Sequence, residues 1–179
     1  MAAVAAEVCV KAAVGSPDAL GDCPFSQRVV LTLEEKKITY DTNLIDVSNK
    51  PDWLSAISPE GKLPVLKLDD GKSAPDSDVI TQILEEKFPN PSCHSAGVLI
   101  SGIKNIFFLH KFLKSNDGLD VYLKQQSPYV NGENISAVDL SLAPKLFHLI
   151  IVLDHFKGWK VPKTLTYVHA YLKKVTIWG

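Results

Sequence analysis

The sequence predicts an α/β domain followed by an all-α domain. In the first half, apolar residues alternate at a period of two or recur at helical spacing, so strands and helices alternate along the chain. The stretch 88–95 contains proline and serine and indicates a connector, and no strand pattern follows it. We therefore expect an α/β domain over residues 1–88 and a helical domain over residues 96–179.

The elements of the first half follow from local patterns. Val8, Val10 and Ala12 share one face at a period of two, which predicts a strand over 7–13. Residues 15–24 are rich in glycine, proline and aspartate and are predicted to form a loop. The elements expected next are a helix over 25–36, a strand over 38–45, a short helix over 50–57, a strand over 63–68 and a helix over 76–87. This order is the pattern of a thioredoxin-like layer.

The second half predicts helices over 96–114, 136–156 and 165–175. Its sharpest local signal is the spacing of Ser136 and Asp139, which is that of a capping box. Ile135 and Leu140 occupy the two positions of a hydrophobic staple around it. A cap of this kind is expected wherever a buried helix begins, so we interpret the motif as structural.

Composition limits the classes of function. The chain has 179 residues, a net charge of −1, 46% hydrophobic and 22% charged residues, which is ordinary for a globular protein and argues against nucleic acid as its main partner. Three cysteines do not form a disulfide framework, so a reducing compartment is expected. No basic leader is evident, and no apolar run reaches the roughly 20 residues that span a bilayer. We expect a cytosolic protein without stable membrane insertion.

Cys23 is the strongest candidate for chemistry. It ends a loop, and Pro24 suits the first position of the helix that follows. A thiol at a helix N-terminus lies at the positive end of the helix dipole, which favours the nucleophilic thiolate. The alternative use of a free cysteine, as a small buried hydrophobe, is equally compatible with the spacing alone. Ser26 stands where a second thiol of a Cys-x-x-Cys pair would be, so any redox cycle needs an external thiol.

Two further motifs are weaker candidates. Pro64 opens a strand, and a cis bond there would present the backbone of Leu63 to a peptide-like ligand, although a plain edge-strand proline is the simpler reading. Ser77 is expected to cap a helix, and the same N-terminus could hold a carboxylate. Lys11 and Lys50 are ordinary surface lysines by default.

The remaining cysteines are expected to be structural. Cys9 lies on a strand and is expected to pack in the core, and Cys93 is expected at the surface. Cys93 and His94 supply only two of the three or four ligands that zinc needs, so no metal site is predicted.

These motifs, in this order, resemble plant dehydroascorbate reductases of the glutathione transferase superfamily. The resemblance covers most of the chain and is carried by residues 8–15, 20–28, 31–37, 57–65, 76–87, 136–149 and 155–159. It implies a thioredoxin-like glutathione-binding domain followed by a shortened helical domain of glutathione transferase type. It also implies no bound cofactor, with glutathione as co-substrate. We expect the protein to be a monomer in the cytosol.

The resemblance also implies a reaction and a site. Cys23 would be the nucleophile that reduces dehydroascorbate to ascorbate at the expense of two glutathiones, with thiol transferase activity alongside. The residues implied in binding glutathione are Lys11, Asp22, Lys50, Leu63, Pro64, Ser77 and His148, of which Lys11 and Asp22 would also border dehydroascorbate.

Two departures from the family pattern lie in the second half. Residues 116–127 are about a dozen residues shorter than in the family, which corresponds to roughly three helical turns and predicts the loss of a packed helix. The chain also ends at 177–179 before the family's last helix. Two alternatives are therefore kept: a weakly active or inactive glutathione-binding paralogue, and a membrane-associating redox protein that resembles the chloride intracellular channel proteins.

Overall fold

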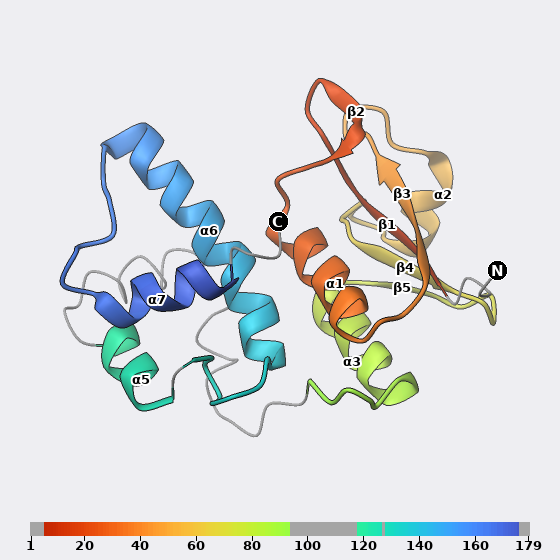
Figure 1. Ribbon diagram of the computed structural model, residues 1–179. Coiled ribbons are helices and arrows are strands. Elements are labelled where there is room, and N and C mark those ends of the chain that lie inside the picture. Colours follow the sequence, from red (N-terminus) through yellow and green to blue (C-terminus); the bar gives the residue numbers. More distant parts are fainter. Residues whose placement is uncertain (1–5, 94–117, 127, 176–179) are drawn as a thin grey trace. The chain divides into compact units, whose positions relative to one another are not determined.

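The structure is a computed structural model that describes residues 6–93, 118–126 and 128–175 (Figure 1). The chain divides into two compact units, Met1–Ser92 and Cys93–Gly179. Each unit has a hydrophobic core of its own. The division falls within the stretch that the sequence indicates as a connector.

The first unit is built on a five-stranded sheet with β1 at its centre. The strands are β1 (Ala6–Ala13), β2 (Ser16–Leu20), β3 (Tyr40–Ile45), β4 (Val65–Leu68) and β5 (Ser73–Pro75). β1 pairs in parallel with β3 and antiparallel with β2 and β4, and β4 pairs antiparallel with β5. Val8 is therefore flanked by Thr42 on one side and Leu66 on the other.

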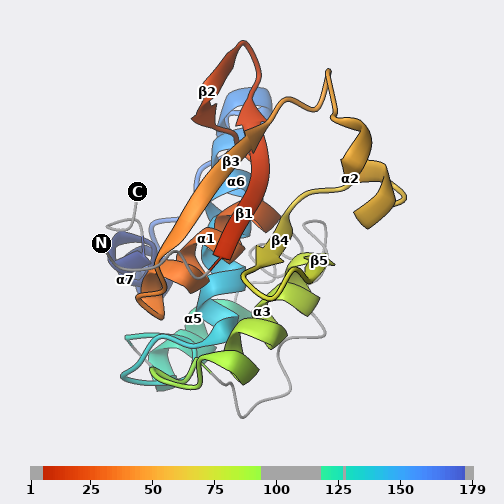
Figure 2. The same ribbon diagram turned by 90° about the vertical axis from the view of Figure 1, so that its right-hand side faces the viewer.

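Helices cover both faces of this sheet. α1 (Pro24–Glu35) and α3 (Ser77–Lys87) run beside each other, as Figures 1 and 2 show. Because neighbouring strand residues point to opposite faces, Val8 and Val10 pack with these two helices. Cys9, between them, packs in a second cluster with Leu54 of α2 (Asp52–Ile57). The predicted thioredoxin-like architecture is confirmed.

Two strands lie where the sequence predicts none. β2 falls inside the predicted loop 15–24, and β5 falls between the predicted strand 63–68 and the predicted helix 76–87. Every residue of β2 is exposed, so the strand has no alternation of apolar and polar residues to detect. It forms through backbone pairing with the end of β1, where Ala12 lies opposite Leu20. The loop prediction was therefore wrong for this segment.

The second unit is helical in the part that the structure describes. Its elements there are α5 (Gly118–Gln126), α6 (Ala137–Lys157) and α7 (Thr166–Val175). The helix predicted over 96–114 and the chain end at 177–179 lie outside the described residues. None of the described helices is long and apolar enough to cross a membrane.

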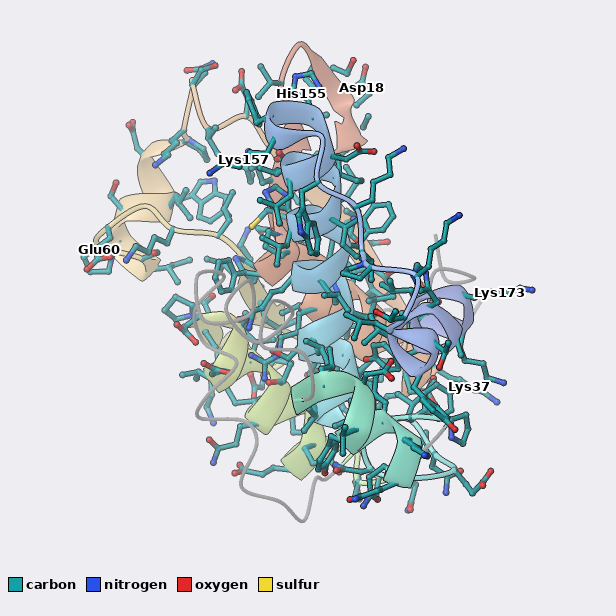
Figure 3. All side chains as sticks on the ribbon, turned by 90° about the vertical axis from the view of Figure 1, so that its left-hand side faces the viewer. Asp18, Lys37, Glu60, His155, Lys157 and Lys173 are labelled. Atoms are coloured by element: carbon teal, nitrogen blue, oxygen red, sulfur yellow. The ribbon has the colours of Figure 1, made fainter. Side chains whose placement is uncertain are left out.

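The predicted capping box begins α6. The Asp139 carboxylate is fully buried and accepts hydrogen bonds from the Ser136 N–H at 2.9 Å, the Ser136 hydroxyl at 2.7 Å and the Val130 N–H at 2.9 Å. At the other end, His155 and Lys157 lie in the last turn (Figure 3), where cations complement the helix dipole.

A helix occupies the stretch that is short relative to the family. α5 lies within residues 116–127, and its Leu119 and Leu123 are buried in the core of the second unit. Its Asp120 also accepts hydrogen bonds from the backbone N–H groups of Tyr167 and Val168, at 2.7 and 2.9 Å. A packed helix is therefore present in this stretch, and the loss of a further helix relative to the family stays a prediction.

Candidate active site

Cys23 lies where the sequence places it, at the start of a helix. It is the N-cap residue of α1, and Pro24 follows in the first turn. The Cys23 carbonyl oxygen accepts a hydrogen bond from the Gln27 N–H at 3.0 Å. The residue is half-buried and is not in a disulfide. Cys23 is thus partly exposed at the positive end of the α1 dipole.

The end of β1 fixes the loop that leads into Cys23. The Gly21 N–H donates to the Lys11 carbonyl at 2.8 Å. A Cβ at Gly21 would lie 2.5 Å from the Ala12 carbonyl oxygen, so only glycine allows this approach. The Lys11 N–H in turn donates to the hydroxyl of Ser26 at 3.4 Å, and Ser26 is fully buried. Gly21, before Cys23, and Ser26, after it, are therefore both hydrogen-bonded to the backbone of Lys11 at the end of β1.

An ion pair flanks the cysteine. The Lys11 ammonium lies 2.8 Å from the Asp22 carboxylate, on the residue directly before Cys23. The hydrogen bond that Lys11 donates to Asp22 raises the pKa of Lys11 above its ordinary value, and the negative charge of Asp22 acts in the same direction. Lys11 is therefore a cation at every physiological pH, within electrostatic reach of the sulfur.

The predicted proline motif lies between α2 and β4. The Leu63–Pro64 peptide bond is cis, as expected, and Leu63 is half-buried. Lys50 also lies close to this loop, although it precedes Gly61 by eleven residues. A Cβ placed on Gly61 would lie 3.0 Å from the ammonium nitrogen of Lys50. The exposed Lys50 ammonium thus lies beside Gly61, two residues before Leu63.

The cap of α3 differs from the prediction by one residue. Asp76, and not Ser77, is the N-cap, and its carboxylate accepts the N–H groups of Asp78 at 2.7 Å and Val79 at 3.4 Å. Asp76 has a φ of 74°, a conformation that costs a non-glycine residue about 1–3 kcal/mol. Ser77 becomes the first residue of the helix and is buried.

The comparisons with known proteins agree with this geometry. A model described as glutathione S-transferase, N-terminal domain, matches residues 19–92. The chain is 59% identical over 180 residues to the probable glutathione S-transferase DHAR1, cytosolic, of Oryza sativa subsp. japonica, covering 92% of this chain and 84% of the relative. It is 55% identical over 186 residues to glutathione S-transferase DHAR2 of Arabidopsis thaliana, covering 95% and 87%.

A solved structure supports the same assignment. The crystal structure of Chlamydomonas reinhardtii dehydroascorbate reductase matches with a TM-score of 0.83 and 36% identity, over 97% of this chain and 88% of that one. This chain belongs to the dehydroascorbate reductase class of the glutathione S-transferases. The fold extends further, because glutathione transferase Omega 3C from Trametes versicolor matches with a TM-score of 0.73 at 22% identity.

Some site predictions for this dehydroascorbate reductase family member remain predictions. His148 is half-buried on α6, in the second unit, while the other proposed site residues lie in the first. Its part in the glutathione site therefore rests on the family resemblance alone. Among the described residues, no three histidine, cysteine, aspartate or glutamate side chains gather as a metal site.

Sequence reasoning missed a bridge between α1 and α3. Arg28, on α1, is buried and pairs with Asp78 and Thr81 of α3. The partners are separated by 50 and 53 positions, so spacing could not join them. The sequence does offer one sign that this position is special, because Arg28 is the only arginine in the chain.

The other two thiols of this family member are buried. Cys9 is fully buried, as predicted, and burial raises the pKa of its thiol to about 11. The expectation of a surface position for Cys93 was wrong, because Cys93 is 3% exposed and its carbonyl accepts the Ala137 N–H at 2.7 Å. That bond places Cys93 beside the start of α6, which a reading of the local connector sequence could not reveal.

Selective alkylation of Cys23 is expected from this contrast. At pH 8, with a pKa of about 11, only about one Cys9 thiol in a thousand is ionised, and burial blocks the reagent as well. Iodoacetamide at pH 8 should therefore modify Cys23 first, by at least a hundredfold in rate, as read by peptide mass spectrometry. In denaturant all three thiols should react at similar rates. Labelling of Cys9 as fast as Cys23 in the native protein would contradict the burial described above.

Proposed function

We propose that this protein reduces dehydroascorbate to ascorbate with two glutathiones, using Cys23 as the only redox-active thiol. The observation that carries the proposal is the position of Cys23 as the N-cap of α1, beside the Lys11–Asp22 ion pair. Membership of the dehydroascorbate reductase class supports the choice of substrates. The name of the rice relative supports a cytosolic location, and we propose that the protein acts there as a monomer.

The cycle needs one protein sulfur and two glutathione sulfurs. The Cys23 thiolate adds to an electrophilic carbonyl carbon of dehydroascorbate, and the new alkoxide takes up a proton. A glutathione thiolate then attacks the Cys23 sulfur, the carbon–sulfur bond breaks, and its electron pair leaves with ascorbate. A second glutathione thiolate attacks the mixed disulfide, which releases oxidised glutathione and restores the Cys23 thiolate. Two electrons pass from two glutathiones to one dehydroascorbate.

Ser26 explains why the second thiol must come from solution. Its hydroxyl occupies the position from which a resolving thiol would attack, but it is fully buried and accepts the Lys11 N–H. An alcohol is not ionised at neutral pH and cannot displace glutathione from a disulfide. The cycle therefore uses one protein thiol, and the mixed disulfide persists until a second glutathione from solution attacks it.

Each end of glutathione has a proposed partner. The Lys50 ammonium would pair with the glycyl carboxylate, and the Leu63 backbone, before cis Pro64, would pair with the cysteinyl part. Ser77, in the first turn of α3, would hold the γ-glutamyl carboxylate at a helix N-terminus. His148 is proposed to bind glutathione on the ground of the family resemblance, and Lys11 with Asp22 would border dehydroascorbate.

Glutathione is expected to bind and stabilise the native protein. A ligand at a concentration 100 times its Kd adds about 2.7 kcal/mol to the free energy of unfolding, which a thermal melt detects. Ser77→Ala should raise the KM for glutathione about tenfold and leave the KM for dehydroascorbate unchanged, because it removes one hydrogen bond to a charged group.

The matched control is Ser55→Ala, at an exposed serine on α2, which should change neither constant. A melting temperature that does not respond to glutathione would overturn the proposed site. Stabilisation without any consumption of dehydroascorbate would instead identify a glutathione-binding paralogue without turnover.

A further inference from the structure

We propose that Arg28 is a positioning residue that sets the selectivity for the γ-glutamyl end of glutathione, by holding the Ser77 end of α3 against the helix that begins at Cys23. This inference rests on the proposed glutathione site and names a residue that no part of that proposal uses. Arg28 lies within α1, one helical turn beyond Cys23, and reaches across to the first turn of α3. The two helices run side by side (Figure 2).

The guanidinium reaches Ser77 by two routes. Nη1 is paired with the carboxylate of Asp78, the residue that directly follows Ser77. Nη2 donates to the Thr81 hydroxyl at 3.2 Å, and that hydroxyl donates to the Ser77 carbonyl oxygen at 2.9 Å. Both routes therefore reach the C-terminal side of Ser77, one through the next residue and one through its carbonyl oxygen, and both lead back to one side chain on α1.

The geometry of an arginine suits this pair of contacts. Its planar fork reaches two acceptors in a fixed geometry, whereas a lysine ammonium is a single point charge on a flexible stem. Lysine and arginine together number 19 in this chain, and Arg28 is the only arginine. The only arginine in the chain thus lies where one side chain contacts both Asp78 and Thr81 of α3.

Stability alone does not account for Arg28. The residue is 6% exposed, and its Nε atom is buried without a hydrogen-bond partner in the described part of the chain. A buried donor without a partner is costly, and an apolar side chain would fill the same space between the helices without that cost. Asp78 is half-exposed, which weakens the ion pair as a source of stability. The contacts therefore serve mainly to orient the first turn of α3.

The test compares glutathione with cysteinylglycine, which lacks the γ-glutamyl group. The selectivity is the ratio of kcat/KM for glutathione to kcat/KM for cysteinylglycine, with dehydroascorbate held at saturation. Arg28→Met should lower this ratio about tenfold, with kcat at saturating glutathione changed less than about threefold. Arg28→Lys, which keeps the charge facing Asp78, should recover part of the loss. A general loss of folded protein would lower both kcat/KM values and leave the ratio unchanged.

Coupling to Ser77 supplies the second arm. If Arg28 acts through Ser77, the double variant Arg28→Met/Ser77→Ala should lose no more selectivity than Ser77→Ala alone. Thr81→Val, a change of similar volume that breaks only the second route, should lower the ratio about threefold and guards against poor folding of Arg28→Met.

The outcomes separate the two proposals. If the wild-type enzyme shows no preference for glutathione over cysteinylglycine, the proposed γ-glutamyl site is wrong. If wild type is selective but folded Arg28→Met and Thr81→Val are equally selective, only the role of Arg28 is overturned. Additive losses in the double variant would likewise exclude action through Ser77.

Discussion

Cys23→Ser is expected to lower the rate of dehydroascorbate reduction by at least about a thousandfold. The serine hydroxyl is neutral at physiological pH, and its oxygen cannot enter the mixed disulfide through which the electrons of glutathione pass. The rate is measured as ascorbate formed at saturating glutathione, after subtraction of the reaction without protein. In the same experiment, mass spectrometry of wild type should detect one glutathione attached at Cys23, and the variant should carry none.

Cys93→Ala provides the control for this substitution. Cys93 is also a cysteine, but it is buried in the second unit beside the start of α6 and has no part in the proposed site. Its replacement should leave the rate unchanged and preserve the adduct at Cys23. Full turnover in Cys23→Ser would show that a different group reduces dehydroascorbate, whatever the geometry at the start of α1.

The parts of the fold that the sequence predicts are those with a local signal. The alternation in β1, the Cys23-Pro24 start of α1 and the Ser136–Asp139 capping box each depend on a few neighbouring residues. β2 has no such signal, because it is exposed throughout and is formed only by its pairing with β1.

The cap of α3 shows the limit of local reasoning more closely. Asp76 and Ser77 are both good N-cap residues and are adjacent, so the sequence cannot choose between them. The structure chooses Asp76, because its unusual backbone conformation turns the carboxylate toward the first free N–H groups of α3. The choice leaves Ser77 inside the first turn.

The candidate site residues also differ in whether a local sequence signal predicts them. Cys23 could be proposed from helix electrostatics, whereas Lys11, Asp22 and Lys50 entered only through resemblance to a family. The Lys11–Asp22 ion pair depends on how β1 ends, and the approach of Lys50 to Gly61 depends on a loop that returns to it, and neither is encoded in spacing. Arg28 and Lys36 are the residues that sequence reasoning passed over, since a charged side chain on a helix is expected to be solvated unless its partners are known.

Lys36→Met is expected to destabilise the first unit by about 3–5 kcal/mol. The Lys36 side chain is completely buried at the end of α1, and its ammonium lies 2.6 Å from the Glu85 carboxylate. It also donates to the carbonyl oxygens of Phe88 at 2.7 Å and Pro91 at 2.9 Å, both in the connector after α3. Methionine fills the volume but removes the ammonium from the Glu85 carboxylate and from both carbonyl oxygens, which is the costly way to break a buried pair.

The adjacent lysine provides a matched control. Lys37, labelled in Figure 3, is exposed, and Lys37→Met should change the free energy of unfolding by less than about 0.5 kcal/mol. Unfolding of the first unit can be followed through Cys9, which is fully buried there and reacts with a thiol reagent only when the unit opens. In Lys36→Met the labelling rate of Cys9 should rise more than a hundredfold, while in Lys37→Met it should not change.

Measurements of substrate selectivity distinguish the stabilising role of Lys36 from the positioning role proposed for Arg28. Lys36 lies at the far end of α1 from Cys23, and its partners lie in the connector and late in α3. Well below the melting temperature, Lys36→Met should therefore keep the wild-type preference for glutathione over cysteinylglycine, although it unfolds more readily. If its stability equals that of Lys37→Met, the buried ammonium does not hold the connector. If stability and selectivity fall together, the two ends of α1 are energetically coupled, and orientation of α3 depends on the whole length of the helix.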